Sequence, residues 1–135
     1  MICAVVDTNV IVSAALTHNP DSPTVKVLNG LFLKEYAILY NEEILYEYET
    51  VLSRSKFNIS AEEIKNLLAF IRDYGIPSER FPYGEAMPDE KDRVFYEITL
   101  SREDSFLVTG NLKHFPREPR VVTPAEMLEI LESGR

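Results

Sequence analysis

Residues 2–9 read Ile-Cys-Ala-Val-Val-Asp-Thr-Asn, a short apolar run followed at once by polar side chains. The run from Ile2 to Val6 is rich in β-branched residues, which is typical of a strand buried on both faces of a parallel sheet. The residues from Val10 to Leu16 then have a helical pattern. A buried strand that leads into a helix predicts an α/β fold, with Asp7 at the end of the strand.

The same alternation of strand and helix continues along the rest of the chain. Further strands are predicted at residues 36–40, 80–83, 105–109 and 120–123. Helices are predicted at residues 25–33, 42–52, 61–74, 89–99 and 124–131, with Asn41 and Ser60 as N-caps and Gly75 at a helix end. We therefore expect one domain, residues 1–135, with three α/β/α layers around a central, mostly parallel sheet of about four or five strands.

The composition excludes several classes of protein. The chain has 135 residues, with 14 Lys or Arg and 22 Asp or Glu, and a formal net charge of −8. This excess of acid argues against a protein that binds nucleic acid through its overall charge alone. A single cysteine, Cys3, excludes an intrachain disulfide and zinc clusters of Cys and His. The sequence has no basic leader and no long apolar run, so we expect a cytoplasmic protein without a membrane span.

Polar side chains follow two of the predicted strands at the edge where a ligand would bind. Asp7 comes directly after the first strand, and Gly110-Asn111 follows the strand that ends at Thr109. In an open parallel α/β sheet, ligands bind beyond the carboxyl ends of the strands. We therefore expect Asp7 and Asn111 to line a site at this edge.

Three further acids extend the predicted site. Glu47 lies beside the apolar stripe of its helix, and Asp89 and Asp92 share one face at the start of another helix. Carboxylates gathered in one place repel one another, and a bound divalent cation removes that conflict. A donor set made only of oxygen atoms favours Mg²⁺ or Mn²⁺ over zinc. The acids therefore predict a metal centre suited to phosphoryl chemistry.

Four motifs resemble the PIN-domain ribonucleases. They are MICAVVDTNVIVSA at residues 1–14, NEEILYEYETVL at 41–52, PDEKDRVF at 88–95 and FLVTGNLKHFP at 106–116, with the IKNLL helix at residues 64–68 among them. The resemblance covers about residues 2–130, and the TGNLKHFP ending is similar to the branch described as toxins of toxin–antitoxin systems. It implies a PIN-like fold and a Mg²⁺- or Mn²⁺-dependent ribonuclease that hydrolyses phosphodiester bonds in RNA. It also implies a homodimer and an antitoxin protein as partners.

The resemblance also implies roles for individual residues. The catalytic set is acidic apart from one carboxamide: Asp7, Glu47, Asp89, Asp92 and Asn111, of which the four acids would bind the metal. The supporting polar residues, which would orient the acids, are Thr8, Asn9 and Thr109. Asn111 stands where many members of the family have a fourth Asp, so this chain offers a neutral oxygen ligand there. In the family a metal-bound water is the nucleophile, so His114 is left out of the catalytic set.

Basic and aromatic side chains supply candidates for contact with RNA. The basic residues nearest the predicted site, which are candidates for phosphate contact, are Lys113, Arg117 and Arg120. Four tyrosines could stack on bases, although packing in the core or an interface is their more common role: Tyr36, Tyr40, Tyr46 and Tyr48.

Each site residue also has a simpler explanation. Asp7 could cap the helix that follows it, and Asp89 and Asp92 could favour the dipole of theirs. Glu47 could be a solvated helix residue. Asn111 suits a turn whatever the function.

Two other classes of function remain as alternatives at this stage. Because Asn111 replaces an acid, the chain could be a catalytically weak or inactive PIN-fold module with a nucleic-acid-binding or regulatory role. A phosphatase is disfavoured because Asn9 stands where that class has a second Asp. A phosphorylated receiver domain is disfavoured because Thr109-Gly110 stands where that class has a Lys.

Overall fold

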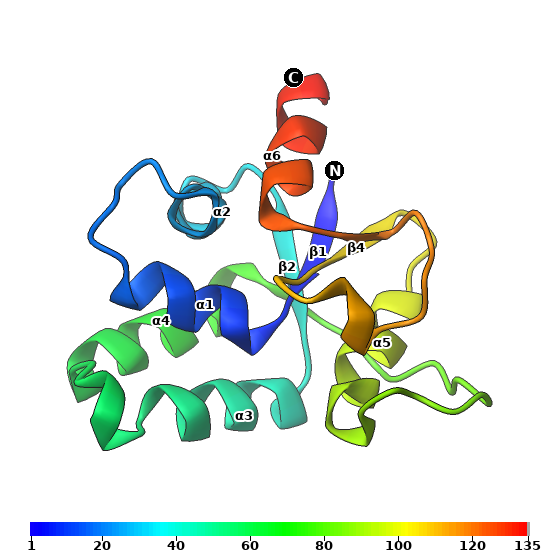
Figure 1. Cartoon of the computed structure of the whole chain (residues 1–135), viewed down its shortest axis with the longest axis horizontal. Helices are drawn as coiled ribbons and strands as arrows, with labels where there is room; N and C mark the ends of the chain where they lie inside the picture. Colours follow the sequence, from blue (N-terminus) through cyan, green and yellow to red (C-terminus); the bar gives the residue numbers. More distant parts are fainter. Residues whose placement is uncertain (135) are drawn as a thin grey trace.

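The protein is built around a five-stranded sheet, seen in a computed structural model that describes residues 1–134. The strands are β1 Cys3–Val6, β2 Ala37–Tyr40, β3 Ile76–Pro77, β4 Ser105–Val108 and β5 Val121–Val122. All neighbouring strands pair in parallel, in the order β3-β2-β1-β4-β5. β1 therefore lies at the centre of the sheet, between β2 and β4 (Figure 1).

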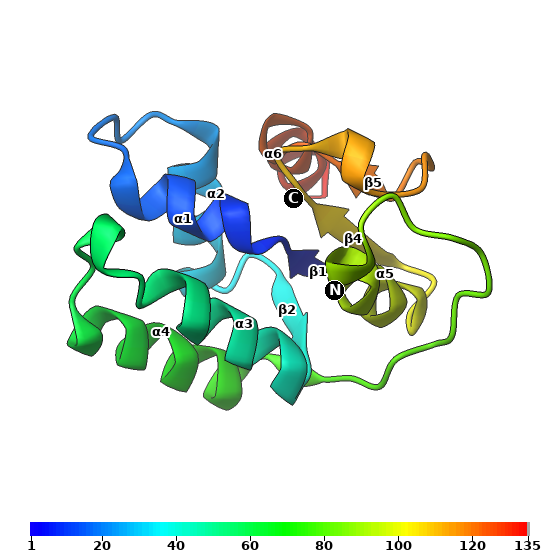
Figure 2. The same ribbon diagram turned by 60° about the horizontal axis from the view of Figure 1, so that its bottom comes forward.

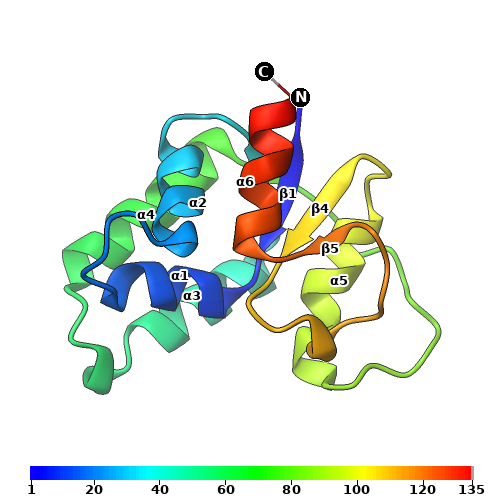
Figure 3. The same cartoon turned by 45° about the horizontal axis from the view of Figure 1, so that its top comes forward.

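Helices pack on both sides of this sheet. The α-helices are α1 Thr8–Leu16, α2 Pro23–Phe32, α3 Glu42–Leu52, α4 Ala61–Tyr74, α5 Arg93–Leu100 and α6 Pro124–Ser133. α2 contacts α1 and α6, whereas α5 packs against β1, β2 and β4. α3 and α4 run side by side (Figure 2), with α4 against β2 and α3 reaching both α1 and α5. α6 lies alongside β1 (Figure 3). The expected α/β fold with a parallel sheet is confirmed.

Side-chain caps fix where the functional helices begin. Asn41 Oδ1 accepts a hydrogen bond from the N–H of Ile44 at 2.9 Å, which starts α3 at the predicted position. Ser60 Oγ accepts from the N–H of Glu63 at 3.1 Å and starts α4 in the same way. Each cap satisfies a backbone donor that the helix itself leaves unpaired. A fixed start of α3 also fixes the direction in which Glu47 points.

Two predicted elements differ from the structure. Residues 80–83 were expected to form a strand, but they lie in an irregular segment, and the edge strand is instead Ile76–Pro77. The reason is that Arg80 and Tyr83 bond to Glu97 rather than to a neighbouring strand. The helix expected at residues 89–99 is divided into a 3₁₀ turn, η2 Glu90–Asp92, and α5.

The apolar core fills both sides of β1. Cys3 and the other residues of this strand are fully or almost fully buried, as predicted for a central parallel strand. Tyr36, Tyr40 and Tyr48 are buried, whereas Tyr46 is 72% exposed and is the one of the four able to meet a ligand. Within residues 1–134, no helix combines the length and the apolar character that crossing a membrane requires.

Candidate active site

Asp7 lies at the centre of the site because β1 is the middle strand. Its N–H donates to the carbonyl oxygen of Val108 at 2.9 Å, which extends the pairing of β1 with β4. Its carboxylate is buried, and Thr109 Oγ1 donates to Oδ2 at 2.8 Å. Burial raises the pKa of Asp7, and the hydrogen bond from Thr109 opposes that rise. Asp7 occupies the N-cap position of α1, yet its carboxylate is held by Thr109 rather than by a capping bond.

Glu47 is brought to Asp7 by two contacts of α3, one with the first residue of α1 and one with the last residue of β1. Thr8 Oγ1 donates a hydrogen bond to Glu47 Oε2. The next residue of α3, the fully buried Tyr48, donates from its hydroxyl group to the carbonyl oxygen of Val6 at 2.5 Å. Burial raises the pKa of Glu47, and the nearby charge of Asp7 adds to the rise. Glu47 is therefore half-buried beside Asp7 and is not a fully solvated residue of α3.

Asp92 supplies a third carboxylate, at the end of η2. Its side chain is only 14% exposed, and its Oδ2 atom is inaccessible to solvent and makes no hydrogen bond within residues 1–134. Burial raises the pKa of Asp92 to about 6, and the charges of Asp7, Asp89 and Glu47 contribute to that rise. A buried carboxylate oxygen without a donor is costly unless something else binds it.

Asp89 and Asn111 lie at the rim of the same site. Asp89 is exposed, and its Oδ1 accepts a hydrogen bond from the N–H of Lys91 at 3.0 Å, so it also stabilises the turn η2. The side-chain amide nitrogen of Asn111, Nδ2, lies 2.9 Å from His114 Nε2. On the other side of the imidazole ring, His114 Nδ1 lies 3.3 Å from Asp92 Oδ2. His114 therefore connects Asn111 to Asp92.

The sequence interpretation left His114 out of the site, and the structure places it in contact with Asp92. His114 follows Asn111 by three residues and ends the turn η3 Leu112–His114, and this spacing alone does not indicate a contact with Asp92. A histidine beside Phe115-Pro116 is more often structural, and only the fold reveals that this turn faces η2. The supporting residues divide into two groups: Thr8 and Thr109 are buried and hold acids, whereas Asn9 is exposed.

The acids meet the chemical requirements of a divalent cation. Asp7, Glu47 and Asp92 interact electrostatically, and each has a raised pKa. Asp92 Oδ2 makes no hydrogen bond among the described residues, although His114 Nδ1 lies 3.3 Å from it. Within residues 1–134, no group of three or more His, Cys, Asp or Glu side chains is placed to hold a metal ion. Mg²⁺ does not require such a group, because it keeps several waters and binds through one or two carboxylates. The donor set therefore fits an open, hydrated Mg²⁺ or Mn²⁺ site.

The basic residues around the site differ in how much they are already engaged. Arg120 donates hydrogen bonds to Glu118 Oε1 at 2.7 Å and to the carbonyl oxygen of Arg102 at 3.0 Å, so its guanidinium group is already engaged in bonds within the protein. Lys113 and Arg117 are exposed and form no ion pair with residues 1–134. These two remain available for a phosphate. On another side of the site, Arg54 and Lys91 attract the charge of Glu47.

The geometry agrees with the family to which the sequence belongs. A family model described as the PIN domain matches residues 3–113, so this chain is a member of the PIN-domain family. The matched range contains every acid of the site and Asn111, and it ends one residue before His114. PIN domains are typically nucleases and generally use divalent metal ions. No curated protein matches the chain.

Proposed function

We propose that this protein is a Mg²⁺- or Mn²⁺-dependent endoribonuclease that hydrolyses phosphodiester bonds in RNA. The proposal is carried by one observation: three buried or half-buried carboxylates with raised pKa values, Asp7, Glu47 and Asp92, lie near enough to one another to interact electrostatically. Mutual repulsion makes this group of acids unfavourable by itself, and a cation of opposite charge would relieve it. Membership of the PIN-domain family supports nuclease activity in general.

Each residue would have a definite task in this reaction. Asp7, Glu47 and Asp92 would hold the cation, with Asp89 and Asn111 assisting at the rim. The cation, when bound, polarises the phosphate and lowers the pKa of a coordinated water. Thr109 and Thr8 keep the carboxylates of Asp7 and Glu47 oriented through their hydroxyl hydrogen bonds.

The biological setting belongs to the same proposal. The similarity of TGNLKHFP to toxins of toxin–antitoxin systems supports a toxin role, with an antitoxin protein that covers the acidic pocket. The resemblance likewise supports a homodimer and a cytoplasmic location, and we treat residues 1–135 as one PIN domain. An antitoxin encoded beside this gene would strengthen the toxin role at once.

A second candidate function is a catalytically weak module that binds nucleic acid or regulates. It is favoured by Asn111, whose amide is turned to His114 and offers no negative charge to a cation. The two candidates predict different behaviour with metal. An active nuclease binds Mn²⁺ and cleaves RNA, whereas the module cleaves nothing and needs no metal.

The test combines cleavage with metal binding. Single-stranded RNA is incubated with the wild type and with Asp7→Asn in the presence of Mn²⁺, and Mn²⁺ binding is measured by calorimetry. We expect cleavage by the wild type and a loss of at least about 100-fold in Asp7→Asn, since the central ligand is removed. Equal cleavage of RNA by the wild type and Asp7→Asn would contradict the proposed site. Absence of both Mn²⁺ binding and cleavage in the wild type would select the second candidate.

A further inference from the structure

Glu97 is a buried carboxylate outside the acid cluster, and it accepts two hydrogen bonds with a further guanidinium group nearby. It lies on α5 and is 6% exposed. Arg80 Nε donates to its Oε1 at 2.8 Å, and the N–H of Tyr83 donates to its Oε2 at 2.8 Å. Arg93, one turn earlier on α5, lies 3.8 Å from the same Oε2. Burial alone would raise the pKa of Glu97, but these donors outweigh it, so its pKa is lowered and it remains ionised.

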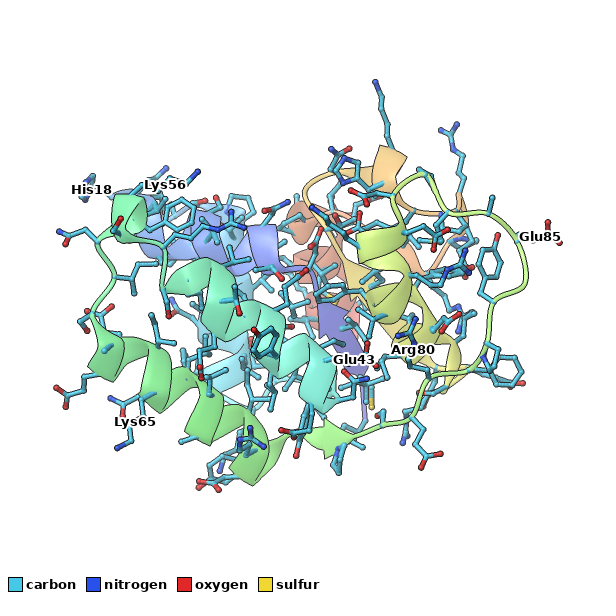
Figure 4. The ribbon with its side chains drawn as sticks, turned by 90° about the horizontal axis from the view of Figure 1, so that it is seen from below. His18, Glu43, Lys56, Lys65, Arg80 and Glu85 are labelled. Carbon is cyan, nitrogen blue, oxygen red and sulfur yellow. The ribbon has the colours of Figure 1, made fainter. Side chains whose placement is uncertain are left out.

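Arg80 connects Glu97 to the helix that carries Glu47. Its Nη1 atom donates to Glu43 Oε2 at 2.9 Å, and Glu43 lies one turn before Glu47 on α3. Figure 4 shows Arg80 and Glu43 side by side, where α3 meets the segment that leads to α5. A single guanidinium group therefore joins α3, which carries Glu47, to α5, which directly follows Asp92.

Arg93 holds the segment that leads to Asp92. It directly follows Asp92, and its guanidinium donates to the carbonyl oxygens of Tyr83 at 2.6 Å and Glu85 at 2.9 Å. It also bonds to Glu90 in η2 at 2.7 Å. Glu85 lies far out on the loop in Figure 4, so these bonds fasten the loop close to its outer bend.

The segment needs such bonds because its own backbone forms no regular structure. Residues 78–89 contain neither helix nor strand. Backbone groups that lack a partner in a helix or a strand must find one in side chains or water. The N–H of Phe81 donates a hydrogen bond to the carbonyl oxygen of Glu97 at 3.0 Å. The ring of Tyr83 packs edge-on against the ring of Tyr96, with 4.9 Å between the ring centroids. The segment is thus fixed to α5 at several points.

We propose that Glu97 is a positioning residue of the active site, acting with Arg80 and Arg93 as a clasp that sets the place of Asp92 relative to Glu47. This inference rests on the proposed metal-dependent function. Residues that orient metal ligands through bonds beyond the ligands themselves commonly change metal affinity or activity by about 10- to 100-fold when they are replaced. Glu97 has this kind of place, because it is linked through Arg80 to Glu43 on α3 and lies beside Arg93, the residue that follows Asp92.

The test replaces the carboxylate while keeping its shape. In Glu97→Gln, the new NH₂ group faces either Arg80 or the N–H of Tyr83, so one donor loses its acceptor. We expect Mn²⁺ to bind about tenfold more weakly. We also expect kcat for RNA cleavage to fall by a similar factor while KM changes by less than about twofold. Hydrogen exchange of residues 78–92 should become faster.

Two further variants separate positioning from simple stability. Arg80→Lys keeps a charge but cannot bridge two carboxylates with the same geometry, so its Mn²⁺ affinity should lie between those of the wild type and Arg80→Gln. The control is Arg72→Gln, which breaks an exposed pair of similar length: Arg72 donates to the two carboxylate oxygens of Glu42 alone, at 2.8 and 3.0 Å. We expect Arg72→Gln to leave Mn²⁺ affinity and kcat unchanged.

The outcomes test the positioning role of Glu97 separately from the proposed nuclease function. A folded Glu97→Gln protein with unchanged Mn²⁺ affinity and kcat overturns the inference. If Glu97→Gln does not fold, the partly exposed Arg80→Gln takes its place under the same criteria. A wild type that binds no Mn²⁺ and cleaves no RNA overturns the proposed function. In that case hydrogen exchange still tests whether Glu97, Arg80 and Arg93 hold the segment in place. Faster exchange of residues 78–92 in Glu97→Gln supports this role, and unchanged exchange refutes it.

Discussion

Thr109 donates a hydrogen bond to Asp7 across the sheet, from Oγ1 at the end of β4 to Oδ2 at the end of β1, at 2.8 Å. The donor is fully buried and the acceptor is 3% exposed. The same Oγ1 accepts from the N–H of Asn111 at 3.0 Å, so one hydroxyl group orients both an acid and the turn that carries Asn111. The ends of the two central strands are therefore fixed to each other where the acids meet.

Replacing the hydroxyl group of Thr109 should lower the free energy of unfolding of the protein. Thr109→Val keeps the shape of the side chain but leaves the carboxylate of Asp7 without its donor. A hydrogen bond to a charged group contributes about 1.5–3 kcal/mol, so we expect the free energy of unfolding at pH 7 to fall by about that amount. Urea unfolding measures it. The control is Thr99→Val, which removes a buried bond to the neutral carbonyl oxygen of Phe95. Equal losses in the two variants would contradict a role for the charge of Asp7.

Asp92 should make the stability of the metal-free protein depend on pH. Its pKa is raised from 3.8 to about 6, so the folded state holds the proton more tightly than the unfolded state does. The contribution to stability is then fully present below pH 3.8 and is lost as the pH rises through about 6. Asp92→Asn, which has no proton to lose, should be more stable than the wild type at pH 7 by roughly 1–3 kcal/mol.

Urea unfolding in EDTA from pH 4 to pH 7.5 measures the difference between Asp92→Asn and the wild type. We expect the gap to close towards pH 4. Glu90→Gln is the control within the same turn, because Arg93 lowers the pKa of Glu90 and its loss should not stabilise the protein at pH 7. A stability gap of constant size across this range would show that Asp92 does not carry the raised pKa.

Tyr48 should affect both stability and activity, because it joins α3 to β1 beside Glu47. Tyr48→Phe removes the bond to the carbonyl oxygen of Val6 and should lower the free energy of unfolding by about 1 kcal/mol. RNA cleavage should fall as well, since α3 loses a constraint next to Glu47. Tyr36→Phe is the matched control: its hydroxyl group bonds to the carbonyl oxygen of Val27 at 2.9 Å, away from the acids. The idea fails if Tyr36→Phe reduces cleavage as much as Tyr48→Phe does.

The basic residues should separate into binding and structural groups. Binding of single-stranded RNA to Asp7→Asn is followed by fluorescence anisotropy at several salt concentrations. Lys113→Gln and Arg117→Gln should each reduce the slope of log affinity against log salt by about 1, as expected for a lost phosphate contact. Arg120→Gln should leave the slope unchanged and lower the unfolding temperature, because Arg120 is bonded to Glu118 and Arg102. A reduced slope in Arg120→Gln alone would reverse this assignment.

Local patterns were sufficient to predict most of the fold. Short apolar runs with β-branched residues mark β1, β2 and β4, and side-chain caps such as Asn41 mark the helix starts, because both signals depend on near neighbours. The central acids were predicted from the position of Asp7 after a strand and from motif resemblance. The fold then brings Asp7 together with Glu47 and Asp92.

What could not be predicted depends on residues far apart in the sequence. Residues 80–83 contain two aromatic residues that suit a strand, but Pro82 cannot donate to a strand ladder, and Arg80 bonds to Glu97, which lies 17 positions away on another element. Glu97 itself has no local sign of a role, since a single acid in a helix is usually solvated. His114 is similar, because only the fold places the turn η3 against Asp92. Side-chain bonds between irregular segments leave no periodic trace in a sequence.

The central place of β1 also determines when the site can exist during synthesis. Asp7 is made near the start of the chain, but its hydrogen-bond donor Thr109 lies 102 positions later. β1 has one neighbour, β2, available early, and its other neighbour, β4, only after residue 108 has been made. Pairing between strands so distant in sequence is slow, because a long loop must close first. The hydrogen bond that holds the carboxylate of Asp7 can therefore form only late in synthesis, after residue 109 has been made and β4 has paired with β1.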